Sequence, residues 1–469
     1  MSVGWILFLF FSILLIAMFS GAPVFTSLGF TALIGIISWL GKNHIQQFGI
    51  IAYTQGTSFN QIIAPMFIMM SEFLSQGKIA EDIYSVLNRA IGRFKGGLAI
   101  STTLACTIFA ALCGSSPATA ASIGRISISE MTKRGYSPAF AVGTVAAGGT
   151  LGIMIPPSIT FCFFGILTET SIVRLLMAGI LPGIMLSLLI IVSIAIRVRI
   201  NPKLIDWNPE LEHSAKGPNN FAHEPLESTV QKAHDESSGS ENAVDILQPE
   251  QMKKDIGFLT ILPSLLLIFV VLGSMYFGFA TPMEAAGYGV LGALIIVVAQ
   301  RRLTMKIFMS VMSNTARTGS MMIFLMMCGF AMSYVITYLG IAQNIANAIA
   351  ASGLSKYFVL LLLYMLWFIL GCLMDPASVI ILTIPFLFRT LTGFGFDPLW
   401  IGVVTVLTSQ IAMITPPVGM NLFVLKANTD VPMQDIIVGS LPYVAILLIG
   451  LAMITAFPVI ATLLPNLMF

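Results

Sequence analysis

The chain has 469 residues, of which 57% are hydrophobic and only 9% are charged. A soluble protein of this length needs more charged side chains to cover its surface, so the composition excludes a soluble globular fold and predicts a polytopic membrane protein in the lipid bilayer. The net charge of +2 is spread over membrane-flanking loops and gives no reason to expect a nucleic-acid partner.

The first half begins with Met1–Trp5, which carries no basic residue before its apolar run, so we expect a retained first span rather than a cleaved signal. Scaffold helices are predicted within 1–95, and a transport hairpin with a broken helix within 97–197, so that 1–199 forms one repeat. The predicted elements are spans over 4–20, 24–41 and 48–75, a connector over 78–95, a small-residue segment over 97–130, a broken span over 138–166 and a closing span over 174–197.

A polar segment at about 200–255, rich in Asp, Glu, Asn, His and Ser, separates this half from the next. It has too little apolar area to offset its ordering entropy, so we expect a flexible linker. The second half, 256–469, repeats the plan, with scaffold helices within 257–355 and a transport hairpin and broken helix within 357–464. Its predicted elements are spans over 257–279, 283–300 and 309–338, a connector over 341–355, a small-residue segment over 357–391, a broken span over 398–425 and a closing span over 436–464.

Proline positions tie the two halves together at one constant offset of 260 residues. The matched pairs are Pro138 with Pro398, Pro156 with Pro416, Pro157 with Pro417, and Pro182 with Pro442. In a membrane protein, Gly and Pro interruptions at corresponding places in two halves indicate the position of a substrate site.

The two small-residue segments each carry a helix-breaking patch at their middle, Gly114–Pro117 in the first and Gly371–Pro376 in the second. A single span would not place Gly and Pro at its centre, whereas a re-entrant hairpin would. The predicted fold class is therefore all-α, with two inverted-topology repeats. Each repeat has five transmembrane helices, one re-entrant hairpin and an amphipathic connector.

Positive charge supports the inversion, because five crossings per half place the two halves in opposite orientations. With the N-terminus outside, 18 of the 23 Lys and Arg residues lie on the cytoplasmic side, four lie outside, and Arg317 lies within a span. We expect a multi-pass protein of the bacterial cytoplasmic (inner) membrane, with both termini periplasmic and the linker cytoplasmic.

Sequence motifs of enzymes and metal centres are absent. The five cysteines lie in apolar segments without a CxxC pair, and the four histidines lie in loops without metal-ligand spacing. No P-loop, GxSxG or HExxH motif occurs. We therefore expect no enzymatic activity, no ATP hydrolysis and no bound cofactor.

The two hairpin tips carry the polar groups best placed for chemistry. Ser115, Ser116 and Thr119 cluster at the first predicted chain reversal, where hydroxyls and freed carbonyls could bind a hard cation and a helix N-terminus could face an anion. The alternative is that small residues there only allow close helix packing. At the second tip, Asp375 at membrane depth costs roughly 2.5–3.5 kcal/mol, which favours a functional role. It could equally act as the N-cap of the following helix, with Pro376 at the first helical position, and both roles can coexist.

The Pro-Pro breaks and three charged residues complete the candidates. Two consecutive prolines unwind a helix and expose carbonyls such as those of Gly152 and Ala412, although a kink without any ligand is the alternative. Arg125 lies beyond the first hairpin and could be an ordinary snorkelling arginine. Arg317 lies within a span and could face a cavity, whereas Glu284 is expected to cap the next span.

Several of these motifs together resemble the large membrane subunit of tripartite ATP-independent periplasmic (TRAP) transporters, over nearly the whole chain. The segments that carry the resemblance are 114–125, 148–158, 167–171, 178–183, 281–286 and 415–423. The resemblance implies a sodium-driven importer of elevator type. In this family a periplasmic binding protein delivers an organic acid, such as a C4-dicarboxylate or sialic acid, and a small membrane subunit of four helices completes the complex.

The resemblance also implies which residues bind sodium, the coupling ion, and which bind substrate between the two sodium sites. The implied sodium-binding residues are Gly114, Ser115, Ser116, Gly148, Gly149, Thr150, Gly152, Pro156, Gly371, Met374, Asp375, Thr408, Ala412 and Thr415. The implied substrate-binding residues are Ser115, Thr119, Arg125, Pro157, Arg317, Asp375, Pro417 and Asn421.

Two features depart from the family pattern. The linker at 200–255 is longer and more polar than expected, and no four-helix extension precedes Trp5, so the small subunit is expected to be a separate chain. Two other functions stay open at this point. One is a stand-alone sodium/dicarboxylate symporter of the same architecture, and the other is a membrane scaffold that transports nothing.

Overall fold

The computed structural model describes residues 3–205, 260–341, 343–344, 347 and 353–468. These residues form helices, turns and one isolated bridge between Tyr136 and Ile205, without a strand. The expectation of an all-helical protein is therefore confirmed for the described chain. Most of the linker predicted at 200–255 and much of the connector predicted at 341–355 lie outside the described residues.

The helices of the first half follow the predicted order. They are α1 (Val3–Phe19), α2 (Val24–Gly35), α3 (Ile45–Gly56), α4 (Ile63–Gln76), α5 (Ile79–Ile91), α6 (Gly97–Cys113), α7 (Ser116–Lys133), α8 (Pro138–Thr150), α9 (Ile159–Thr168) and α10 (Ile172–Ile200). Those of the second half are α13 (Leu262–Tyr276), α14 (Pro282–Ala299), α15 (Met305–Tyr338), α17 (Lys356–Leu373), α18 (Pro376–Gly393), α19 (Pro398–Ala412), α20 (Met420–Asn428), α21 (Met433–Ala456) and α22 (Val459–Met468).

The predicted interruptions of the two small-residue segments are present. The first segment is divided into α6 and α7 at Gly114 and Ser115, and the second into α17 and α18 at Met374 and Asp375. The helices on the two sides of each interruption contact each other, as the arms of a hairpin do. The spans with Pro-Pro pairs are also broken, between α8 and α9 and between α19 and α20.

Two predicted spans are wrong, because each is divided into two helices. The span expected at 48–75 is interrupted after Gly56, where Ser58 is extended at φ −71°, ψ 125°; Gly and Ser are weak helix formers. The closing span expected at 436–464 ends at Ala456 in α21, and α22 follows. Pro458 explains this break, because a proline disfavours helical geometry at the residue before it.

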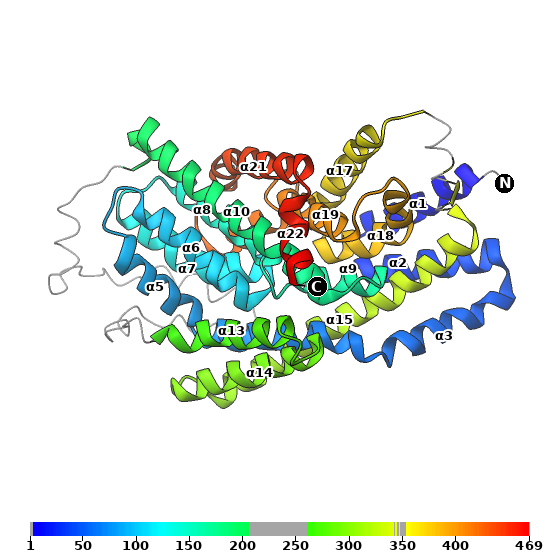
Figure 1. Ribbon diagram of the computed structural model, residues 1–469, viewed down its shortest axis with the longest axis horizontal. Helices are drawn as coiled ribbons and strands as arrows, with labels where there is room; N and C mark the ends of the chain where they lie inside the picture. The colour runs from blue at the N-terminus through cyan, green and yellow to red at the C-terminus, as the bar shows by residue number, and fades with distance from the viewer. Residues whose placement is uncertain (1–2, 206–259, 342, 345–346, 348–352, 469) are drawn as a thin grey trace, which may run out of the picture.

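Broken helices form the centre of the molecule. Every residue from Phe140 to Thr150 in α8, and from Leu399 to Ala412 in α19, is buried. The backbones of α8 and α21 approach so closely that a Cβ added at Gly143 would collide with the Gly439 carbonyl oxygen. In Figure 1, α13 and α14 lie along one long side and α10 and α21 along the opposite side.

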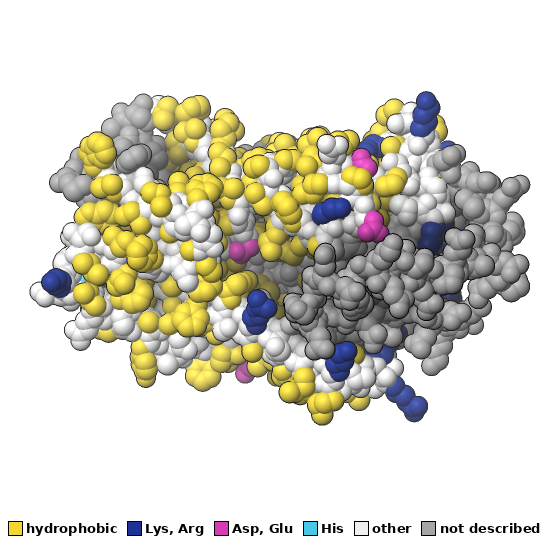
Figure 2. Space-filling view, turned by 180° about the vertical axis from the view of Figure 1, so that it is seen from behind, with side chains coloured by type: hydrophobic (Ala, Val, Ile, Leu, Met, Phe, Trp, Pro, Cys, Tyr) yellow, Lys and Arg dark blue, Asp and Glu magenta, His cyan; other side chains and the backbone are white. Residues whose placement is uncertain are grey.

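The outer surface is suited to lipid. Figure 2 shows hydrophobic side chains over much of the described part of one face, with few charged side chains among them. Large apolar residues such as Phe19 and Phe279 are 75% and 82% exposed. Six helices of the described chain are long and apolar enough to cross a membrane, which supports a polytopic membrane protein.

Candidate functional site: two hairpin tips on two helix breaks

The first tip lies directly against the first helix break. Gly114 ends α6 at φ +63°, and a side chain at this position would collide with the Pro157 carbonyl oxygen. A Cβ at Gly152 would lie 2.6 Å from the Ser115 carbonyl oxygen and 2.8 Å from Thr119 Oγ1. Glycine at these two positions therefore permits the tip and the break to touch through their backbones.

Polar and small residues of the first tip form hydrogen bonds within the tip and pack against the break. The Thr119 hydroxyl donates to the Ser115 carbonyl at 2.8 Å and the Thr119 N–H donates to the same carbonyl at 3.1 Å. Ser116 is fully buried at the start of α7. Gly149 packs on Ala120, where an added Cβ would lie 2.7 Å from the Ala120 Cβ. The sequence-predicted residues of this tip and break are thus brought together.

The second tip packs on the second break in a similar way but with different chemistry. A Cβ at Gly371 would lie 2.8 Å from the Ala412 Cβ, and the Gly419 N–H donates to the Cys372 carbonyl at 3.3 Å. Asp375 accepts from the Ser378 N–H at 3.1 Å and from the Ser378 hydroxyl. The N-cap role of Asp375 is confirmed, and its role as a sodium ligand stays a prediction.

At the tips and breaks, two fully buried amides of the second half donate hydrogen bonds to the first half. Asn421 Nδ2 donates to Ser116 Oγ at 2.7 Å, and Gln410 Nε2 donates to Thr150 Oγ1 at 2.9 Å. All four residues are fully buried. Asn421, predicted to bind substrate, here contacts the first tip. Gln410 was not among the predicted residues, although an amide in an apolar helix, 260 positions from Thr150, was a signal that could have found it.

Other predicted residues have local partners or lie apart. The hydroxyls of Thr408 and Thr415 donate to carbonyls one turn earlier in the chain, at 2.7 Å and 2.8 Å. Arg125 is exposed on α7, about 15 Å of helix rise beyond the first tip. Arg317 is exposed on α15, which packs on α2, α3, α4 and α18. The remaining predicted residues lie in the tips and breaks, with Gly148, Pro156, Pro157 and Met374 buried and Pro417 exposed.

A carboxylate that the sequence analysis did not select lies close to the first hairpin. Glu72 on α4 accepts from Gln76 Nε2 at 2.9 Å and Asn314 Nδ2 at 3.3 Å through the same oxygen. The neighbouring Ser71 hydroxyl lies 2.8 Å from Cys113 Sγ, at the end of α6. A glutamate inside the predicted span 48–75 was the available signal, because intramembrane carboxylates are functional by default.

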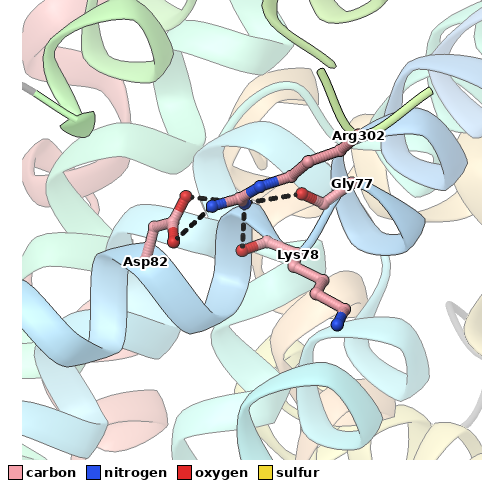
Figure 3. A network of polar contacts seen from close by, with 4 residues as sticks. All are labelled: Gly77, Lys78, Asp82 and Arg302. Carbon is pink, nitrogen blue, oxygen red and sulfur yellow. Dashed lines mark hydrogen bonds and ion pairs between the residues drawn. The ribbon is translucent and has the colours of Figure 1, made fainter. Parts of the chain in front are cut away.

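A charged clamp joins the scaffold helices of the two halves (Figure 3). Arg302, between α14 and α15, donates through Nη1 to the carbonyls of Gly77 at 2.8 Å and Lys78 at 3.2 Å. It also binds both carboxylate oxygens of Asp82, at 2.8 Å and 3.0 Å. Lys78 is left-handed at φ 60°, so the guanidinium holds the tight turn between α4 and the connector α5. Next to Asp82, burial raises the pKa of Glu81.

The fold defines the class of protein, a polytopic all-helical membrane protein. It is similar to the Alcanivorax borkumensis YdaH transporter, with a TM-score of 0.58 and 14% identity over 90% of this chain and 91% of that one. It is also similar to Neisseria gonorrhoeae MtrF, with a TM-score of 0.55 and 14% identity over 90% and 85% of the two chains. At such low identity these similarities concern the fold alone.

Sequence comparison identifies the family. Residues 11–460 match the tripartite ATP-independent periplasmic transporter, DctM component, and the chain belongs to this family. It is 33% identical over 441 residues to the C4-dicarboxylate TRAP transporter large permease protein DctM of Pseudomonas aeruginosa, covering 94% of each chain. It is 27% identical over 456 residues to the sialic acid TRAP transporter large permease protein SiaM of Vibrio cholerae, covering 96% of each. The resemblance inferred from the motifs is therefore confirmed, and these relatives are permeases rather than enzymes.

Proposed function

We propose that this TRAP large permease subunit imports an organic acid together with sodium, and receives that acid from a periplasmic binding protein. The observation that carries the proposal is the pairing of each hairpin tip with its own helix break, in a member of this family. Unwound backbone at membrane depth supplies the carbonyl oxygens and helix ends that ion-coupled transporters use for binding.

The residues of the first tip and break suit sodium, a hard cation that prefers oxygen ligands. Ser115 and Ser116 supply hydroxyls and carbonyls, and the break beside Gly152 supplies further carbonyls. At the second tip, Asp375 adds negative charge, and its cap fixes the start of α18. Each sodium ion entering along the membrane potential releases about 2.3 kcal/mol per 100 mV, which is an energy source for uphill import.

The proposed substrate is a small organic acid, and relatives named for C4-dicarboxylates and for sialic acid support this class. It would bind between the tips, within reach of Ser115, Thr119 and Asn421, with Arg125 and Arg317 as counter-charges on the path. We propose an elevator movement, in which the hairpins and broken helices of 97–197 and 357–464 travel against the scaffold helices of 1–95 and 257–355.

The proposed partners are a small membrane subunit and a periplasmic binding protein. An isethionate TRAP permease protein DctMQ of Oleidesulfovibrio alaskensis is 29% identical, and this chain covers 65% of it. We place the protein in the bacterial inner membrane with its second half inverted, as the distribution of Lys and Arg indicates.

Uptake into proteoliposomes tests the proposal. The chain is reconstituted with its small subunit, and radiolabelled C4-dicarboxylates and sialic acid are supplied with or without the binding protein from its operon and an inward sodium gradient. We expect uptake only when sodium and the binding protein are both present. Uptake without the binding protein would instead favour the stand-alone symporter, and sodium-independent uptake would refute sodium coupling.

Three substitutions test ion binding, and the two at Asp375 separate it from helix capping. Ser115→Ala should reduce sodium-coupled uptake while the protein still inserts into the membrane. Asp375→Asn keeps a capping oxygen but removes the charge, whereas Asp375→Ala removes both. If the carboxylate acts on sodium, both variants lose uptake. Full uptake by Asp375→Asn would show that Asp375 acts as a cap alone.

A further inference from the structure

Gln410 and Thr150 form a hydrogen bond where the two halves of the chain meet. Gln410 lies in α19 and Thr150 ends α8, and both side chains are fully buried. They are 260 positions apart, the same offset as the matched prolines. Thr150 in the first repeat and Gln410 in the second are therefore at equivalent positions. Equivalent positions of two repeats touch only where the repeats themselves adjoin.

The hydrogen bonds fix how the Gln410 amide is turned. The Thr150 hydroxyl has one hydrogen, which it donates to the Ala147 carbonyl at 2.7 Å. It can therefore only accept from Gln410, and the Gln410 Nε2 must point toward it at 2.9 Å. The Gln410 Oε1 is then directed elsewhere, and it is buried without a hydrogen-bond partner among the described residues. Such a buried acceptor calls for a water or an ion as its partner.

The hydrogen bond between Gln410 and Thr150 lies close to both hairpin tips and both helix breaks. Thr150 lies two residues before Gly152, which packs on the Ser115 carbonyl at the first tip. Gln410 itself lies two residues before Ala412, which packs on Gly371 at the second tip. The hydrogen bond from Gln410 to Thr150 therefore joins one break directly to the other.

We propose that Gln410 couples the two ion sites, so that sodium bound at one break increases the sodium affinity of the other. This inference rests on the proposed sodium coupling. The Thr150 hydroxyl gives its one hydrogen to Ala147 and accepts from Gln410, so the Thr150 side chain serves as the link. Gln410 is a positioning residue here, and the signature of its role is cooperativity rather than loss of one site.

Sodium-dependent thermal stabilisation of the full chain in detergent tests the link without requiring transport. The melting temperature is titrated with NaCl at constant ionic strength, with KCl as the balancing salt. The wild type should give a Hill coefficient above 1. Gln410→Met, which removes both polar atoms at similar volume, should lower the Hill coefficient toward 1 and raise the half-saturating sodium concentration about fivefold, the lower end of allosteric coupling.

A control and a second variant make the result specific. Thr405→Val alters a buried hydroxyl of the same helix, which donates to the Ile401 carbonyl at 2.7 Å, and should leave the Hill coefficient unchanged. Thr150→Val removes the other end of the link, so it should lower the Hill coefficient as Gln410→Met does, and the double variant should be no worse than either alone. If Gln410→Met does not fold, Gln410→Leu, which also has no donor for Thr150, takes its place.

The outcomes separate this inference from the function it rests on. A wild type stabilised equally by sodium and potassium would refute sodium coupling itself. Cooperative sodium binding that persists unchanged in Gln410→Met and Thr150→Val would overturn the coupling role of Gln410 and leave sodium coupling intact. A wild-type Hill coefficient of 1 would also overturn it.

Discussion

Replacing Arg302 by glutamine tests whether the clamp in Figure 3 fixes the connector α5 to the scaffold. The substitution removes a bidentate ion pair to Asp82 and two hydrogen bonds that satisfy the carbonyls of Gly77 and Lys78. The Asp82 side chain is only 3% exposed, so water cannot replace the lost partner. The variant therefore retains a buried carboxylate without its counter-charge.

The structure sets the expected size of this effect. Removing one partner of a buried ion pair costs about 3–5 kcal/mol, and because the Arg302 side chain is 29% exposed we expect a value near the lower end. The pair between Arg134 and Glu130 provides a control on the same protein. It is 3.9 Å long with side chains 33% and 34% exposed, and such surface pairs contribute about 0–1 kcal/mol.

The measurement is a double-mutant cycle on unfolding in detergent, with amide hydrogen exchange over Ile79–Ile91 as a local readout. Arg302→Gln should destabilise the protein much more than Arg134→Gln and should speed exchange in α5. Adding Asp82→Asn removes the unpaired charge, so the double variant should be less destabilised than the Arg302→Gln single variant. Equal destabilisation by the Arg302 and Arg134 substitutions, or strictly additive effects in the cycle, would refute the reasoning.

Three further substitutions test separate features. Burial raises the pKa of Glu81 above its ordinary value of 4.5, so the unfolded chain loses this proton first and stability falls as pH rises above about 4.5. Glu81→Gln should remove that decline in thermal melts between about pH 5 and pH 8, and an unchanged slope would contradict the burial argument. Gly143→Ala places a methyl group against the Gly439 carbonyl and should cost roughly 1–3 kcal/mol, seen as a lower melting temperature; an unaltered melt would mean that α8 and α21 can separate. Thr281→Ala removes the capping box with Glu284 at the start of α14 and should cost about 1 kcal/mol in the same assay, whereas Thr281→Ser should keep it.

Features governed by local backbone chemistry were predictable from the sequence. The Pro-Pro pairs gave the helix breaks, the Gly114 and Asp375 patches gave the hairpin tips, and Glu284 was expected to cap α14 as it does. In each case the residue acts on its own turn of backbone, through a missing donor, a left-handed φ or a capping oxygen. Such effects need no knowledge of what lies across the fold.

Features that depend on packing across the fold were not predictable in this way. Hydropathy continues across Pro458, so the span expected at 436–464 looked continuous until the backbone geometry was known. The span expected at 48–75 is different, because the polar run Thr54–Gln61 around Gly56 was a signal of the break that the sequence analysis did not use. To predict the Gln410 contact with Thr150, one would need to know that the two breaks adjoin in space, which the offset of 260 suggests but does not establish. The clamp by Arg302 likewise joins two segments more than 200 positions apart.

The two tips differ in how they are held, and the difference bears on how they would respond to an ion. Asp375 is satisfied within its own hairpin by Ser378, so the second tip keeps its geometry without help from the first half. The Ser116 hydroxyl accepts a hydrogen bond from Asn421, the second residue of α20, which follows the second break. A change at the second break therefore reaches the first tip through Asn421 as well as through Gln410, and because coupling between two binding sites is reciprocal, a change at the first tip reaches the second break through the same contacts. The two tips thus differ in how much of their geometry is set within their own hairpin, while the ion affinity of each should depend on the state of both halves.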